Sequence, residues 1–151
     1  MPRRQGSGRS VIELDQAGID RTLPLVAKGL EQYWQLQLAL PMTNVARDRD
    51  FQRAFNAFYR VRRGPRWQSA FYRLLEQSKG KRPLFAVVLR TLHRATGQVE
   101  ASFTSKLVAT VDPDSPLIDR FVLQNLGLRS PHAGPIEHRL DRSIEIHERI
   151  C

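Results

Sequence analysis

The sequence is poor in metal-binding patterns. Its one cysteine, Cys151, is the last residue, so a single chain can form neither an internal disulfide nor a thiolate metal cluster. The four histidines form no H-E-x-x-H pattern. Asp112 and Asp114 lie in a turn that contains proline, and no further ligands follow at the spacing of an EF-hand. The sequence therefore predicts neither a metal site nor a cofactor.

Long apolar segments are also missing. No run of 18 apolar residues is present, although a membrane-spanning helix would need one. The first ten residues, MPRRQGSGRS, lack the apolar core of a signal peptide. These absences favour a cytoplasmic protein. Residues 1–10 are mainly Arg, Gly and Ser, which predicts a disordered basic tail, and residues 11–151 are enough for a single domain.

Positive charge is abundant and confined to one region. The net charge of the chain is +9, and residues 47–94 contain thirteen Lys or Arg against three Asp or Glu. A basic region of this kind favours a polyanionic partner, DNA first and RNA as an alternative. An acidic protein that meets the basic face is a third alternative.

Apolar residues recur at helical spacing along most of the chain. This pattern predicts an all-α fold of about six helices, with no strand of consequence. An early helix is predicted over residues 22–40, with Leu23, Val26 and Leu30 on its buried side and Pro41 at its end.

A second helix, over residues 49–61, has two different faces. Its aromatic side consists of Phe51, Phe55 and Phe58, and the opposite side consists of Arg49, Arg53 and Arg60. The aromatic side is expected to pack in the core. Because three like charges on one stripe repel one another, we expect the arginines to face phosphates, although a solvated face is the alternative.

A basic turn, RVRRGPRW, follows this helix. Arg62, Arg63 and Arg66 are candidates for nucleic-acid binding, because the arginine fork binds phosphate oxygens two at a time. Trp67 could stack on a base, but its helical spacing with Phe71 favours a place in the core.

Residues 84–126 show the pattern of a helix, a tight turn and a second helix, followed by a third helix over residues 116–126. Gly97 is predicted to end the first of these helices in a left-handed cap. Ser115 is the predicted N-cap of the last helix, which places Asp119 in its first turn. A carboxylate there is favoured by the helix dipole whether or not it has a chemical role.

The segments Ile118-Asp119 and Leu126-Gly127-Leu128 resemble the Val-Asp and Leu-Gly-Leu of the helix-hairpin-helix DNA glycosylase superfamily, with three fewer residues between them. Residues 50–128 are similar to a little-characterised group of small helical bacterial proteins related to those enzymes. The resemblance implies a base-excision N-glycosylase in which Asp119 stabilises the cationic sugar or positions water. It also implies further helical sequence after residue 151, so that a second copy or a partner would cover a C-terminally truncated side.

The hairpin differs from the superfamily pattern at three positions. Gln98 and Glu100 replace its two glycines, and Ser102 stands where bifunctional members have a nucleophilic lysine. Lys106, one helical turn further on, is then expected to contact DNA from the surface. These differences leave a non-catalytic DNA- or RNA-binding module as an alternative. The enzyme hypothesis requires the arginines of residues 47–94 and Asp119 to share one cleft.

Overall fold

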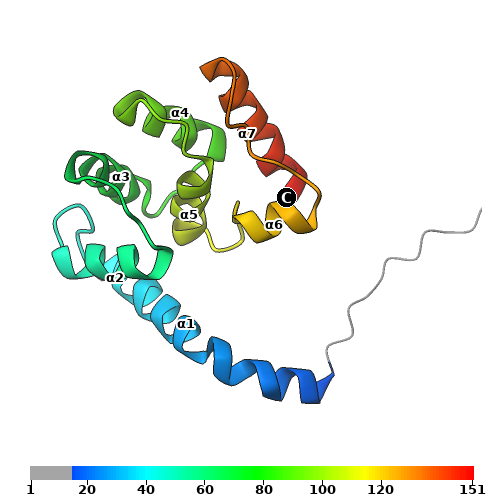
Figure 1. The fold of residues 1–151 in the computed structure, drawn as a ribbon. Helices are drawn as coiled ribbons and strands as arrows, with labels where there is room; N and C mark the ends of the chain where they lie inside the picture. Colours follow the sequence, from blue (N-terminus) through cyan, green and yellow to red (C-terminus); the bar gives the residue numbers. More distant parts are fainter. Residues whose placement is uncertain (1–14) are drawn as a thin grey trace, which may run out of the picture.

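A computed structural model describes residues 15–151 of the chain; the predicted tail of residues 1–10 lies outside the described residues. The described part is a single all-helical domain of seven helices without strands (Figure 1). This confirms the all-α prediction, with one helix more than the six expected. The helices are α1 (Gln16–Met42), α2 (Arg49–Tyr59), α3 (Pro65–Ser78), α4 (Phe85–Thr96), α5 (Ala101–Val111), α6 (Arg120–Asn125) and α7 (Ile136–Ile150). None of them, within these residues, combines the length and apolar character that a membrane crossing requires.

The C-terminal part of α1 and helices α2 to α7 all contribute side chains to an aromatic and aliphatic core. Phe55 lies at its centre, with its ring centroid 5.6 Å from that of Phe71 and 5.7 Å from that of Tyr72. Trp67 stacks on Phe71 at 5.0 Å and is buried, which confirms its predicted place in the core. Aromatic pairs at these separations add to the free energy gained from burial.

Helix α2 follows its predicted pattern. The side chain of Asp48 accepts a hydrogen bond from the backbone N–H of Phe51 at 2.8 Å and so begins the helix. Phe51 and Phe55 are buried and Phe58 is half-buried, as the two-sided pattern predicted. The helix ends at Tyr59, because Arg60 adopts a left-handed conformation with φ of 53°.

Helix α1 differs most from the prediction. It begins at Gln16 and runs through Pro41 to Met42 instead of ending at that proline. The predicted buried stripe is exposed: Leu23, Val26 and Leu30 have 53%, 44% and 46% of their surface accessible. Figure 1 shows the reason, since the N-terminal half of α1 extends away from the other helices.

Helices α4 and α5 form the predicted hairpin. Gly97 ends α4 with φ of 75°, which confirms the left-handed cap. The core face of α4 consists of Phe85, Val88, Leu89 and Leu92, whereas Leu84 and Val87 are exposed. Both faces contain apolar residues at helical spacing, so the sequence pattern alone did not distinguish them.

Helix α6 begins later than predicted, at Arg120 with Asp119 as its N-cap. The predicted start at Ser115 is wrong because a tertiary hydrogen bond fixes the preceding segment. The hydroxyl of Ser105 in α5 accepts this bond from the backbone N–H of Ile118 at 2.8 Å. Gly127 ends the α6 turn with φ of 64°, as expected.

Helix α7 closes the fold against α4. Arg90 of α4 forms ion pairs with Glu137 at 2.9 Å and with Asp141 at 2.6 Å. His147 is buried and stacks on Phe85 with ring centroids 4.1 Å apart. These contacts hold both the first turns and the last turn of α7 against α4.

Candidate nucleic-acid interface and active site

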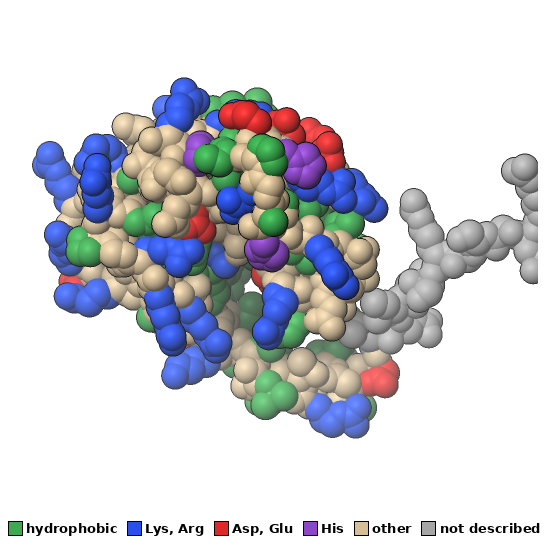
Figure 2. Space-filling model, turned by 45° about the horizontal axis from the view of Figure 1, so that its top comes forward, with side chains coloured by type: hydrophobic (Ala, Val, Ile, Leu, Met, Phe, Trp, Pro, Cys, Tyr) green, Lys and Arg blue, Asp and Glu red, His purple; other side chains and the backbone are tan. Residues whose placement is uncertain are grey.

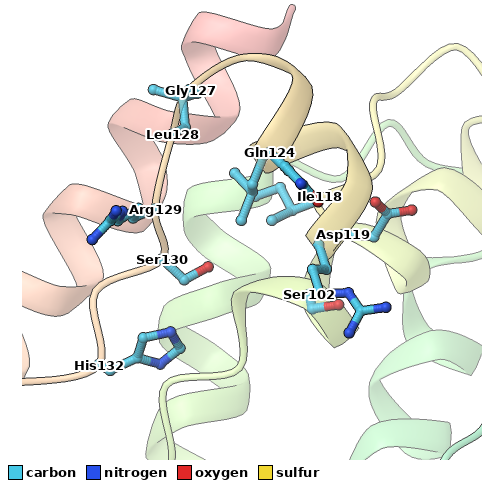
Figure 3. Close-up of a pocket in the computed structure, with 11 residues that line it drawn as sticks. Ser102, Ile118, Asp119, Gln124, Gly127, Leu128, Arg129, Ser130 and His132 are labelled. Atoms are coloured by element: carbon cyan, nitrogen blue, oxygen red, sulfur yellow. The ribbon is translucent and has the colours of Figure 1, made fainter.

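A pocket of 760 Å³ lies between α5, α6 and the segment after α6. Its wall contains the apolar side chains of Ile118, Leu123 and Leu128. Its remaining lining is polar or charged: Ser102, Asp119, Arg120, Gln124, Gly127, Arg129, Ser130 and His132. Ser102 and Asp119 lie on one side of the pocket, and Ser130 and His132 on the other (Figure 3). An apolar wall with a few polar groups is typical of a small-ligand site.

Asp119 lies at the edge of this pocket and begins α6. Its Oδ1 accepts a hydrogen bond from the backbone N–H of Val122 at 2.8 Å. No hydrogen bond within residues 15–151 engages its other carboxylate oxygen. The carboxylate points away from Ser130 and His132 in Figure 3. One oxygen therefore caps α6, and the other has no hydrogen-bond partner among the described residues.

Lys106 of α5 is the electrostatic neighbour of Asp119. Its Nζ donates a hydrogen bond to the Ser102 hydroxyl at 2.9 Å and lies 4.9 Å from the centre of the Phe103 ring. Burial lowers the pKa of Lys106, while the charges of Asp119 and Glu100 act to raise it. Lys106 was expected at the surface, but it is partly buried and close enough to Asp119 to be affected by its charge. The segment before α6, fixed by the Ser105 bond, brings the two residues together.

Arg63, which lies between α2 and α3, contacts the α4–α5 hairpin and is not part of an open arginine surface. Its Nη2 lies 2.8 Å from Oε1 of Glu100, and its Nε donates to the same oxygen at 3.0 Å. The guanidinium group lies 5.2 Å from the centre of the Phe103 ring and 5.9 Å from that of Trp67. Glu100 is buried at the start of α5. The negative charge of Glu100 is therefore compensated within the fold.

The other predicted arginines have different surroundings. Arg53 forms an exposed ion pair with Asp50. Arg60 and Arg62 are exposed, and neither takes part in an ion pair within the described part of the chain. Exposed arginines without an acidic partner keep their charge available to a ligand.

The predicted single cleft is wrong. Arg49 and Arg66 line a hollow between α2 and α3, whereas the pocket that contains Asp119 takes its arginines from Arg120 and Arg129. In Figure 1, α2 and α3 lie on the other side of α5 from α6. The residues before α5 and those after it therefore form two separate candidate surfaces. Arg120 and Arg129 were not singled out because they lie outside the basic region of the sequence.

Lys and Arg side chains are unevenly spread over the described surface. They gather over the side that α2, α3 and α4 occupy in Figure 1, and others stand around a central hollow (Figure 2). Comparisons with family models, curated proteins and solved structures found no match. Among residues 15–151, no group of three or more His, Cys, Asp or Glu could hold a metal ion. The pocket, the hairpin and the basic surface are therefore the observations that bear on function.

Proposed function

We propose that the chain is a nucleic-acid-binding protein of the helix-hairpin-helix glycosylase type. The cleft that was expected to join Asp119 to the arginines of residues 47–94 is not found among the described residues, so base removal at the pocket beside Asp119 is proposed without those arginines. The observation that supports this most is the placement of Asp119 in the lining of a 760 Å³ pocket, together with Ser102, to which the Nζ of Lys106 donates a hydrogen bond at 2.9 Å. Base-excision enzymes turn the target nucleotide out of the helix into such a pocket. Arg120 and Arg129 supply positive charge at its rim for the adjoining phosphates.

The proposed reaction breaks the bond between the sugar C1′ and the base nitrogen. Positive charge develops on the sugar as this bond lengthens, and the free carboxylate oxygen of Asp119 stabilises that charge. A water molecule then forms the new C1′–O bond and loses a proton, and the departing base gains one.

Lys106 offers a second route at the same pocket. Because its pKa is lowered, more of its amine is neutral than in an exposed lysine, and a neutral amine can attack C1′ as the base departs with its bonding electron pair. The C1′–O4′ bond of the sugar then breaks, O4′ gains a proton and the lysine nitrogen loses one, which gives an imine. The resulting imine would be reduced by borohydride to a stable protein–DNA adduct. Borohydride treatment therefore distinguishes the two routes. The amine route gives a protein–DNA adduct that is lost in Lys106→Gln, and the water route gives no adduct.

Asp119→Asn tests the enzyme directly. Asparagine keeps a side-chain oxygen that can cap α6 but removes the negative charge. Duplexes with uracil, hypoxanthine, an alkylated base or an oxidised base are offered to both proteins, and base release is measured. We expect release from at least one duplex by the natural protein and a loss of roughly a hundredfold or more in the variant, as for one charge-stabilising group.

Asp48→Asn is the matched control. Asp48 caps α2 with a bond of 2.8 Å from a backbone N–H three residues on, as Asp119 does for α6. The control variant should therefore keep full activity. Absence of base release on every duplex, or release unchanged by Asp119→Asn, would refute the enzyme proposal.

A non-catalytic binding module is the second candidate. It is favoured by the structural roles of two site residues, since Asp119 caps α6 and Glu100 is paired with Arg63. A module would bind duplex DNA without releasing a base. If six or more phosphates are contacted, affinity should fall on the order of a thousandfold or more between 50 and 200 mM salt. An affinity that does not change with salt contradicts both candidates.

A further inference from the structure

Two adjoining hollows, each of 440 Å³, lie along the start of α2 and the exposed face of α3. They share Ser69 in their linings. Each hollow is lined by two arginines, Arg47 and Arg73 in one and Arg49 and Arg66 in the other. These four arginines and the surface between them are the α2–α3 groove. All four are exposed.

The acidic residues near the groove are already engaged by the fold. The side chain of Asp48 caps α2. Glu76 lines one hollow, but its carboxylate accepts hydrogen bonds from the Val45 N–H and from Lys79, both at 2.9 Å. Neither carboxylate forms an ion pair with a groove arginine among the described residues. The positive charge of the groove is therefore left uncompensated.

The contacts that orient the groove arginines are neutral. Arg49 donates to Oε1 of Gln52 at 3.3 Å, and Arg73 donates to the hydroxyl of Ser69 at 3.3 Å. A neutral partner holds a guanidinium group in place without cancelling its charge. Two arginines in one hollow can then direct several donors at the same phosphate.

The spacing along α3 matches a phosphate backbone. Arg66 and Arg73 are seven residues apart, which is about two turns or roughly 10 Å along a helix. One strand of duplex DNA carries a phosphate about every 3.4 Å along the helix axis. Their long side chains can therefore reach different phosphates of one duplex.

The lining excludes two other kinds of partner. Among the described residues, no large apolar or aromatic side chain lines either hollow. Protein interfaces depend on buried apolar or aromatic anchors at their centre, and single-stranded nucleic acid is held by aromatic rings on which bases stack. A surface of arginine, amide and hydroxyl groups fits a duplex backbone best.

We propose that the α2–α3 groove binds the phosphodiester backbone of duplex DNA through its paired arginines, as a surface separate from the pocket of Asp119. This inference rests on the proposed function for the nature of the partner, and it does not depend on base excision. The contacts are to phosphates, so the groove adds affinity without sequence preference.

The test is the double variant Arg66→Gln with Arg73→Gln in the full chain. Affinity for a 20-base-pair duplex is measured by fluorescence anisotropy over a series of chloride concentrations. We expect the slope of log affinity against log salt to become shallower by about 2, equally for unrelated duplex sequences. Each single variant should reduce the slope by about 1. Thermal melting by circular dichroism should match that of the natural protein, because both side chains are exposed.

Arg21→Gln with Lys28→Gln is the matched control. These residues are also exposed, and they lie seven positions apart on α1, so the control removes the same charge at the same spacing. It should leave the slope unchanged. An equal loss of slope in both double variants, or no loss in the groove variant, would overturn the groove. Failure of the natural protein to bind duplex would overturn both proposals, whereas base release that is absent, or unchanged in Asp119→Asn, would overturn only the enzyme.

Discussion

The ion pair between Arg63 and Glu100 gives a quantitative test of how the hairpin is stabilised. At the N–O distance of 2.8 Å, two unit charges at an effective dielectric constant of 20 attract by about 6 kcal/mol. Removing both charges from water offsets most of that attraction. The side chain of Glu100 is 9% exposed and that of Arg63 is 37% exposed, so we expect a coupling of ~1–2 kcal/mol, above the usual value for an exposed pair.

The two single substitutions should not be equal. Arg63→Gln leaves the Glu100 carboxylate buried without its partner, which should cost about 2–3 kcal/mol. Glu100→Gln leaves the guanidinium of Arg63 partly hydrated and still in contact with Phe103 and Trp67, so that its cost should be closer to ~1 kcal/mol. The order of the two effects therefore follows from which partner is more buried.

Urea denaturation of the natural protein, the two single variants and the double variant measures both quantities. The coupling is the difference between the double effect and the sum of the single effects. A coupling below about 0.3 kcal/mol, or Glu100→Gln more harmful than Arg63→Gln, would refute this account of the hairpin.

Two further predictions concern stability. Burial lowers the pKa of His147 below its ordinary value, so the unfolded chain takes up a proton before the folded one as pH falls. The free energy of unfolding should therefore decline below about pH 6.5. In thermal melts between pH 8 and pH 5, His147→Phe should make this decline less steep. Asp119→Ala removes the cap of α6 and should cost ~1 kcal/mol, whereas Asp119→Asn should cost only a few tenths; equal urea midpoints for the natural protein and the alanine variant would contradict the capping role.

Local sequence patterns predicted the features that depend on neighbouring residues. The aromatic face of α2 and the left-handed cap at Gly97 follow from helical spacing and from glycine's freedom at positive φ. The exposed stripe of α1 did not follow, because spacing shows that Leu23 and Val26 share a face but not whether another helix covers it. Burial depends on the whole fold.

The candidate site was only partly accessible from sequence, for the same reason. Asp119 could be identified from its place after the hairpin, but its neighbour Lys106 depends on the hydrogen bond from Ile118 to Ser105. Those residues are 13 positions apart, and no local pattern specifies such a bond. The sequence identified the basic segment as a whole. It did not show that Arg63 pairs with Glu100 of the hairpin while Arg49 and Arg66 line the α2–α3 groove, because this depends on how α2 packs on its neighbours.

The solvent-facing half of α1 has a consequence for solution experiments. Leu23, Val26 and Leu30 present hydrocarbon to water, and sulfate or phosphate in the buffer strengthens the association of such surfaces. Chloride instead weakens contacts between arginines and phosphates. Sulfate or phosphate would therefore favour association of the chains through α1. A chloride series avoids this effect, so that a change in signal can be assigned to DNA affinity alone.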